Sequence, residues 1–155
     1  MESTEMNAQS AKAKRRRRQA GMTMIELLAV LGVMSSLASI SIPKYRAIAE
    51  GAKRARAIGD LKTIQTTIDT RDSLPADLLS IGVTLVDPWG QPYQYVKFPN
   101  GPARVDRFGV QVNSTYDLYS LGADGVSSNS LNAASSFDDL VRANDGGFLA
   151  LASRY

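Results

Sequence analysis

The sequence predicts an α+β protein in which one long N-terminal helix packs on a small antiparallel sheet. Residues 22–42 are apolar apart from Glu26, which predicts a continuous apolar helix. Apolar residues at helical spacing continue to about residue 70. The rest of the chain has segments of alternating polarity separated by turn residues, which predicts short strands.

The composition excludes several classes of protein. The chain has 155 residues, enough for one modest domain. It has no Cys and no His, which excludes a disulfide framework, a Cys/His zinc site and a His-based catalytic triad. The adjacent acids Asp138 and Asp139 have no accompanying general base, and we therefore expect no enzyme activity.

The positive charge is concentrated in one short tract. Residues 1–21 hold six basic and two acidic side chains, whereas residues 22–155 hold 12 basic and 13 acidic ones. No second basic patch follows, so we expect no nucleic-acid partner.

Residues 22–42 are predicted to form a transmembrane helix. At about 1.5 Å per residue they span about 30 Å, the thickness of a bilayer core. Four arginines at 15–18 precede this segment, which places the N-terminus in the cytoplasm and the rest of the chain across the membrane. A signal peptide cleaved after 36–38 and a plain anchor are alternatives. Neither accounts for Glu26, since a charge in the bilayer costs about 2.5–3.5 kcal/mol on insertion scales.

Residues 43–70 are predicted to continue as an amphipathic helix. Pro43 removes one backbone hydrogen bond and is expected to kink the helix rather than end it. Apolar side chains recur at steps of three and four, and we expect this stripe to face a head domain at 71–155. The stripe consists of Tyr45, Ile48, Ala52, Ala55, Ile58, Leu61, Ile64 and Ile68.

The head is predicted to hold a three-stranded antiparallel sheet. Residues 71–75 break the helix, and 78–86 supply core residues in a loop or short helix. Asp87-Pro88-Trp89-Gly90 has the residues of a turn, with Trp89 expected in the core. The strands are expected at 93–98, 107–112 and 116–121.

The start of the apolar segment resembles a known processing signal. Gly21-Met22-Thr23-Met24-Ile25-Glu26, after a basic leader, resembles the class III signal of type IV pilins and type II secretion pseudopilins. The resemblance implies that a prepilin peptidase removes 1–21 by cutting between Gly21 and Met22, and methylates the new N-terminus at Met22. Thr23, Glu26 and Pro43 match the family pattern, whereas Met22 stands where Phe is usual.

The resemblance also implies a role for Glu26 in assembly. In the family's filaments this carboxylate pairs with the α-amino group of a neighbouring subunit's first residue. An unpaired buried charge costs several kcal/mol, so such a pair selects the axial register. Small residues allow helices to approach closely, although ordinary helix filler is the alternative for each: Gly32, Ser35, Ser36, Ala38 and Ser39.

Two stretches of the head, 87–93 and 116–125, resemble the major pseudopilin family (protein G) of type II secretion systems. This resemblance implies a structural subunit of a periplasmic pseudopilus that drives protein export. The implied partners are further copies of the chain, minor pseudopilins, an inner-membrane assembly platform with its ATPase, and the prepilin peptidase. The implied location is the inner membrane, with a cytoplasmic N-terminus and a periplasmic head. The alternatives are a type IV pilin of a surface fibre for adhesion, motility or DNA uptake, and a monomeric membrane-anchored calcium-binding protein.

The same resemblance implies a calcium site in the head. Ca²⁺ prefers hard oxygen ligands from Asp, Ser and backbone carbonyls. The positions that match the family's ligands are Leu118 (carbonyl), Ser120, Asp124, and Asp138 or Asp139. These last acids lie further from Asp124 than is usual, and turn acids on a solvated surface are the alternative. Asp145 is either a further ligand or a turn residue.

Overall fold

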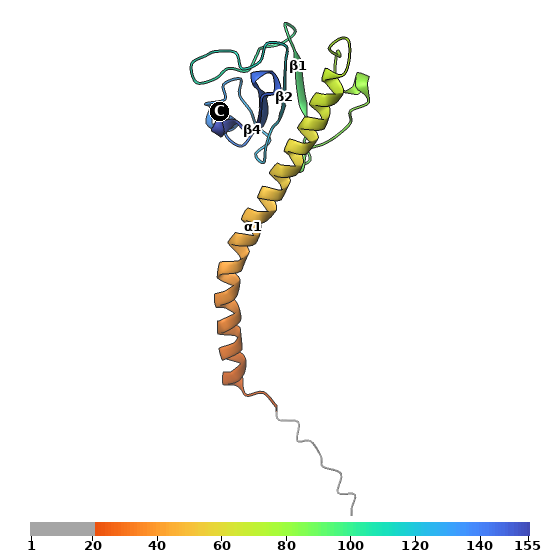
Figure 1. Ribbon diagram of the computed structural model, residues 1–155. Coiled ribbons are helices and arrows are strands. Elements are labelled where there is room, and N and C mark those ends of the chain that lie inside the picture. Colours follow the sequence, from red (N-terminus) through yellow and green to blue (C-terminus); the bar gives the residue numbers. More distant parts are fainter. Residues whose placement is uncertain (1–20) are drawn as a thin grey trace, which may run out of the picture. The chain divides into compact units, whose positions relative to one another are not determined.

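The computed structural model describes residues 21–155 (Figure 1). The chain forms two compact units, one ending at Pro43 and the other running from Lys44 to Tyr155, and each is described by itself. The leader predicted at 1–21 lies, apart from Gly21, outside the described residues.

One helix, α1 (Met24–Asp69), contains nearly all of the predicted apolar and amphipathic regions at 22–42 and 43–70. Pro43 lies inside the helix and does not end it, as predicted. The helix ends at Asp69, just before the predicted break, because Asp72, Ser73 and Pro75 favour turn conformations.

The C-terminal part of α1 packs on the sheet of the head, which confirms the α+β architecture. Its buried side chains are Ala57, Leu61, Ile64, Gln65 and Ile68. The apolar side chains of this set form one core with residues of the head. This core consists of Ala57, Leu61, Ile64, Ile68, Tyr93, Tyr116, Leu118 and Leu140. The predicted stripe is therefore correct from Ile58 onward. It is wrong at its start, where Tyr45 and Ile48 are 74% and 72% exposed, because no sheet lies beside that part of the helix within the Lys44–Tyr155 unit.

Within residues 21–155 the head has a four-stranded antiparallel sheet in the order β1-β2-β3-β4 (Figure 1). The strands are β1 (Gln94–Lys97), β2 (Tyr116–Ser120), β3 (Leu140–Ala143) and β4 (Phe148–Leu151). The first two confirm the strands predicted at 93–98 and 116–121, whereas β3 and β4 were not predicted. Short 3₁₀ turns connect the elements at Leu79–Ile81, Ala134–Ser136, Asn144–Gly146 and Ala152–Arg154.

The strand predicted at 107–112 is wrong, because this segment contains a turn. Asp106 Oδ1 accepts hydrogen bonds from the backbone N–H groups of Phe108 and Val110, both at 2.8 Å. Gly109 follows with φ +76°, a conformation that glycine adopts without strain. Across this turn, Val105 and Gln111 form one isolated antiparallel β-bridge, which is too short to make a strand.

The predicted turn at Asp87–Gly90 is confirmed and has the same geometry. Asp87 Oδ1 accepts from the N–H groups of Trp89 (3.1 Å) and Gln91 (2.8 Å), and Gly90 has φ +93°. Trp89 packs against the core, as predicted, and its Nε1 donates to Glu50 Oε2 at 3.1 Å. Hydrogen bonds from Lys53 and Trp89 hold the pKa of Glu50 below its ordinary value.

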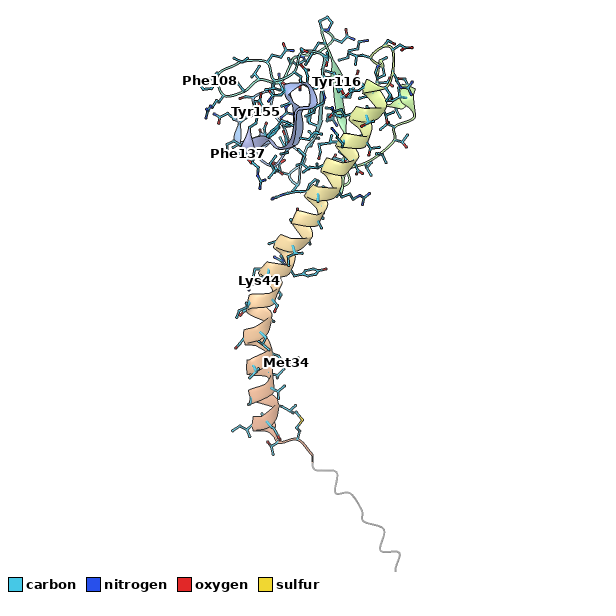
Figure 2. All side chains as sticks on the ribbon, viewed as in Figure 1. Met34, Lys44, Phe108, Tyr116, Phe137 and Tyr155 are labelled. Atoms are coloured by element: carbon cyan, nitrogen blue, oxygen red, sulfur yellow. The ribbon has the colours of Figure 1, made fainter. Side chains whose placement is uncertain are left out.

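Two buried tyrosines connect the sheet to α1. The Tyr93 hydroxyl donates to Asp60 Oδ2 at 3.0 Å, and the Tyr116 hydroxyl donates to Asp69 Oδ1 at 2.9 Å. Figure 2 shows Tyr116 within the head. Burial raises the pKa of both hydroxyls above its ordinary value, and the hydrogen-bonded carboxylates raise it further.

These shifts predict that the head loses stability in alkaline solution. An unfolded tyrosine releases its proton near pH 10, whereas the folded one retains it, so stability is complete below pH 10 and falls above it. The maximum slope is about 1.4 kcal/mol per pH unit for each tyrosine. Urea unfolding of the detergent-solubilised chain, followed by the fluorescence of its single tryptophan, Trp89, measures this slope between pH 8 and 11.

We expect Tyr93→Phe to reduce the alkaline loss of stability. Tyr45→Phe is the matched control, because it removes a hydroxyl from a tyrosine that is 74% exposed, and it should leave the slope unchanged. An unfolding free energy that stays constant from pH 8 to 11 in the unmodified chain would contradict this explanation.

Candidate processing and assembly site

The predicted cleavage site lies in an exposed, non-helical segment. Gly21, Met22 and Thr23 precede the first residue of α1, and all three are exposed. A peptidase requires an accessible, unfolded bond, and the bond between Gly21 and Met22 satisfies this geometrically. Cleavage and methylation at these positions stay predictions.

Thr23 and Glu26 form a capping box at the N-terminus of α1. The Glu26 carboxylate oxygen Oε2 accepts from the Thr23 N–H at 3.3 Å and from its hydroxyl at 3.4 Å. The Thr23 hydroxyl oxygen accepts in return from the Glu26 N–H at 3.3 Å. This cap was not predicted, although Thr-x-x-Glu before an apolar run is its known signature.

The cap changes the expected state of Glu26 before assembly. The carboxylate has hydrogen-bond donors within its own chain and lies at the helix end where the dipole favours negative charge. The Glu26 carboxylate therefore has hydrogen-bond partners within a single subunit. In the pairing that the family resemblance implies, the amine of a neighbouring subunit would have to compete with the Thr23 cap.

The helix surface that follows is predominantly apolar and exposed. All residues of 24–42 are exposed, including Met34 at 61% (Figure 2). By length and composition the helix is able to cross a membrane. The predicted small residues lie on this surface, and Ser35 and Ser36 donate their hydroxyls to the carbonyls of Leu31 and Gly32 at 2.8 and 2.9 Å. These serines thus bring no unsatisfied donor into an apolar environment.

Comparisons with known proteins agree with this site. Residues 16–42 match the prokaryotic N-terminal methylation motif. The chain is 31% identical over 145 residues to the type II secretion system core protein G of Pseudomonas aeruginosa, and the match covers 77% of this chain and 94% of that protein. The chain belongs to the type II secretion system core protein G family. This confirms the family that the sequence resembles.

Further members of the core protein G family are similar over most of their length. The protein of Vibrio cholerae is 26% identical, with 72% of this chain and 86% of that protein covered. The protein of Aeromonas hydrophila is 25% identical, with 71% and 87% covered. No solved structure matches the chain.

The residues predicted to bind calcium lie around the end of β2 and the start of β3. Leu118 and Ser120 are buried on β2, Asp124 is exposed in the following turn, and Asp138 and Asp139 directly precede β3. Asp138 Oδ2 accepts from the backbone N–H groups of Ala123 and Asp124 at 2.7 and 3.1 Å. The structure therefore places Asp138 against the 122–124 loop.

The side chains of these residues are engaged elsewhere. Ser120 Oγ donates to Asp87 Oδ2 at 2.6 Å, and Asp124 Oδ1 accepts from the Val126 N–H at 2.8 Å. Asp139 is fully buried and forms an ion pair with Arg104 at 2.6 Å. Burial raises the pKa of Asp139, and hydrogen bonds from Ser127 and Arg104 oppose this.

The donor set does not fit a calcium site in this geometry. Ca²⁺ takes six to eight oxygen ligands. Across residues 21–155, no three acidic side chains gather closely enough to hold a metal ion. Asp145 serves in a turn, where its carboxylate accepts from the Ser114 N–H at 2.9 Å and from the Ser114 hydroxyl at 2.7 Å.

Proposed function

We propose that this chain is the structural subunit of a type II secretion pseudopilus and polymerises through residues 22–42. The observation that supports this most directly is the exposed, predominantly apolar surface of 24–42. This surface carries one acidic side chain, Glu26, near the start of the helix. Such a surface is stable only when lipid or other apolar helices cover it. The same helix thus serves as a membrane anchor first and as a filament core after assembly.

The proposal includes a location and an order of events. The chain enters the inner membrane with its basic leader in the cytoplasm and its head in the periplasm. The prepilin peptidase then cuts between Gly21 and Met22 and methylates Met22. The assembly platform and its ATPase supply the mechanical work, and minor pseudopilins join the same filament. This chain supplies the polymer, and we infer a structural rather than a catalytic role.

Deletion of the gene tests the proposed function. We expect the bacterium to retain its type II substrates in the periplasm, because no pseudopilus forms, and to regain export when the chain is supplied again. Culture supernatants and periplasmic extracts measure the partition of the substrate. Deletion of the secretion system's ATPase gene is the control for a complete block.

The type IV pilin alternative gives the opposite pattern. A pilin mutant exports its type II substrates normally and loses a fibre from the cell surface. Normal export together with a lost surface fibre would overturn the proposal.

A further inference from the structure

Arg104 is a buried cation in the head. Its side chain is 3% exposed, and its Nη2 donates to Asp139 Oδ2 at 2.6 Å while its Nη1 donates to Ser127 Oγ at 2.8 Å. The guanidinium carbon lies 4.1 Å from the centre of the Tyr119 ring. A buried arginine is tolerated only when it is paired and hydrogen-bonded in this way.

The Arg104 contacts join three segments that are distant in the sequence. Arg104 belongs to the connection between β1 and β2, Ser127 follows β2, and Asp139 precedes β3. The backbone strengthens the junction, because Arg104 N–H donates to Asp117 Oδ2 on β2 at 2.7 Å. Val105 adds two backbone hydrogen bonds to the segment after Ser127, one with Asn129 and one with Leu131, both at 2.9 Å.

We infer that the guanidinium of Arg104, rather than a divalent cation, supplies the positive charge that holds 124–139 to the sheet. Asp139 is one of the two neighbouring positions, with Asp138, at which the family resemblance implies a calcium ligand, and here its Oδ2 accepts a hydrogen bond from the Arg104 guanidinium. A calcium ion bound at the same carboxylate would lie beside a like charge, which is unfavourable at low dielectric. The other carboxylate oxygen, Oδ1, has no hydrogen-bond partner among residues 21–155. It would supply one of the six to eight oxygens that Ca²⁺ requires, whereas the side chains of Ser120 and Asp124 are already hydrogen-bonded to Asp87 and to the Val126 N–H.

The first experiment measures whether stability depends on calcium. The detergent-solubilised full chain is melted in an excess of CaCl₂ and in an excess of EDTA, because a bound ion would raise the melting temperature by mass action. Near-UV circular dichroism and Trp89 fluorescence are the readouts. We expect the same melting temperature of the head in both solutions, because no ion contributes to the folded state. A melting temperature that falls in EDTA and returns with added calcium would overturn the inference.

The second experiment removes the guanidinium. We expect Arg104→Met to lower the melting temperature by about 10 °C or more, because Asp139 is left buried without its partner. Arg107→Met is the matched control, since Arg107 is exposed and should tolerate the change. An Arg104→Met chain that melts like the control would overturn the inference.

A conservative variant covers the case in which Arg104→Met does not fold. Arg104→Lys keeps the charge and loses the paired donors, so we expect an intermediate melting temperature that is insensitive to EDTA. If Arg104→Lys melts like the unmodified chain only when calcium is present, the metal ion supplies the positive charge that holds 124–139 to the sheet. That result would overturn the inference.

Discussion

Glu26→Leu is expected to give a chain that is processed and inserted in the membrane but forms few or no filaments. Leucine removes a charge from the apolar segment, so insertion becomes more favourable. In the filament, however, the neighbouring α-amino group would be buried without its carboxylate. Removing one partner of a buried ion pair costs about 3–5 kcal/mol, which corresponds to a loss of assembly of about 100-fold or more. Sedimentation and electron microscopy of filaments released from the periplasm measure the loss.

The intact mass of the membrane-extracted chain provides the first control for Glu26→Leu. An N-terminus at methylated Met22 shows that cleavage proceeded and that the defect lies in assembly. An N-terminus at Ser39, or an uncut chain, would contradict the processing site itself.

Two variants separate pairing from helix capping. Glu26→Gln retains a side chain that completes the capping box with Thr23 but carries no charge. Thr23→Ala retains the charge and loses the two cap hydrogen bonds that the Thr23 hydroxyl makes. We expect Glu26→Gln to assemble as poorly as Glu26→Leu, and Thr23→Ala to assemble nearly as well as the unmodified chain. Normal filaments from Glu26→Gln would refute the ion pair.

The parts of the fold that depend on local pattern were predictable from the sequence. The helix follows from apolar spacing, and β1 and β2 follow from alternating polarity before recognisable turns. The false strand at 107–112 has a local explanation too. Asp106-Arg107-Phe108-Gly109 repeats the pattern of Asp87-Pro88-Trp89-Gly90, and the two segments form the same turn.

Strand β3 was missed because its polarity pattern misleads. Arg142 on β3 is 3% exposed, and its guanidinium donates to Asn113 Oδ1 and to the Tyr116 carbonyl. The hydrogen-bond partners of the Arg142 side chain lie 29 and 26 positions away, so the sequence around Arg142 does not show that it is buried. The turn at 144–147 did carry a signal, because Asn-Asp-Gly-Gly favours the positive φ that Asn144 and Asp145 adopt.

The candidate sites also differ in how far they could be predicted from residues that are close together in the sequence. The positions of Gly21, Met22 and Glu26 follow from a contiguous motif, and the Thr23 cap is readable from the same residues. The Arg104–Asp139 pair is not readable, because 35 positions separate its members and only the topology of the head brings them together.

Leu61→Ala is expected to destabilise the head by about 2–5 kcal/mol, because it leaves a cavity between α1 and the sheet. Leu61 is fully buried in the core that joins the helix to β2 and β3, whose side chains include Leu118 and Leu140. A domain of this size has a total stability of about 5–15 kcal/mol, so the change removes a large part of it. The melting temperature should fall by about 10–20 °C. Trp89 fluorescence measures it in detergent, where the apolar half of α1 is covered.

Leu79→Ala is the matched control, since the same atoms are removed from a leucine that is 72% exposed. We expect the melting temperature of this control to change by no more than about 2 °C. The comparison also distinguishes folding from assembly. A Leu61→Ala chain is still expected to be cut and to enter the membrane, because its 22–42 segment is unchanged, whereas its head should be degraded faster by periplasmic proteases. Equal melting temperatures for Leu61→Ala and Leu79→Ala would show that the sheet does not depend on α1 for its core.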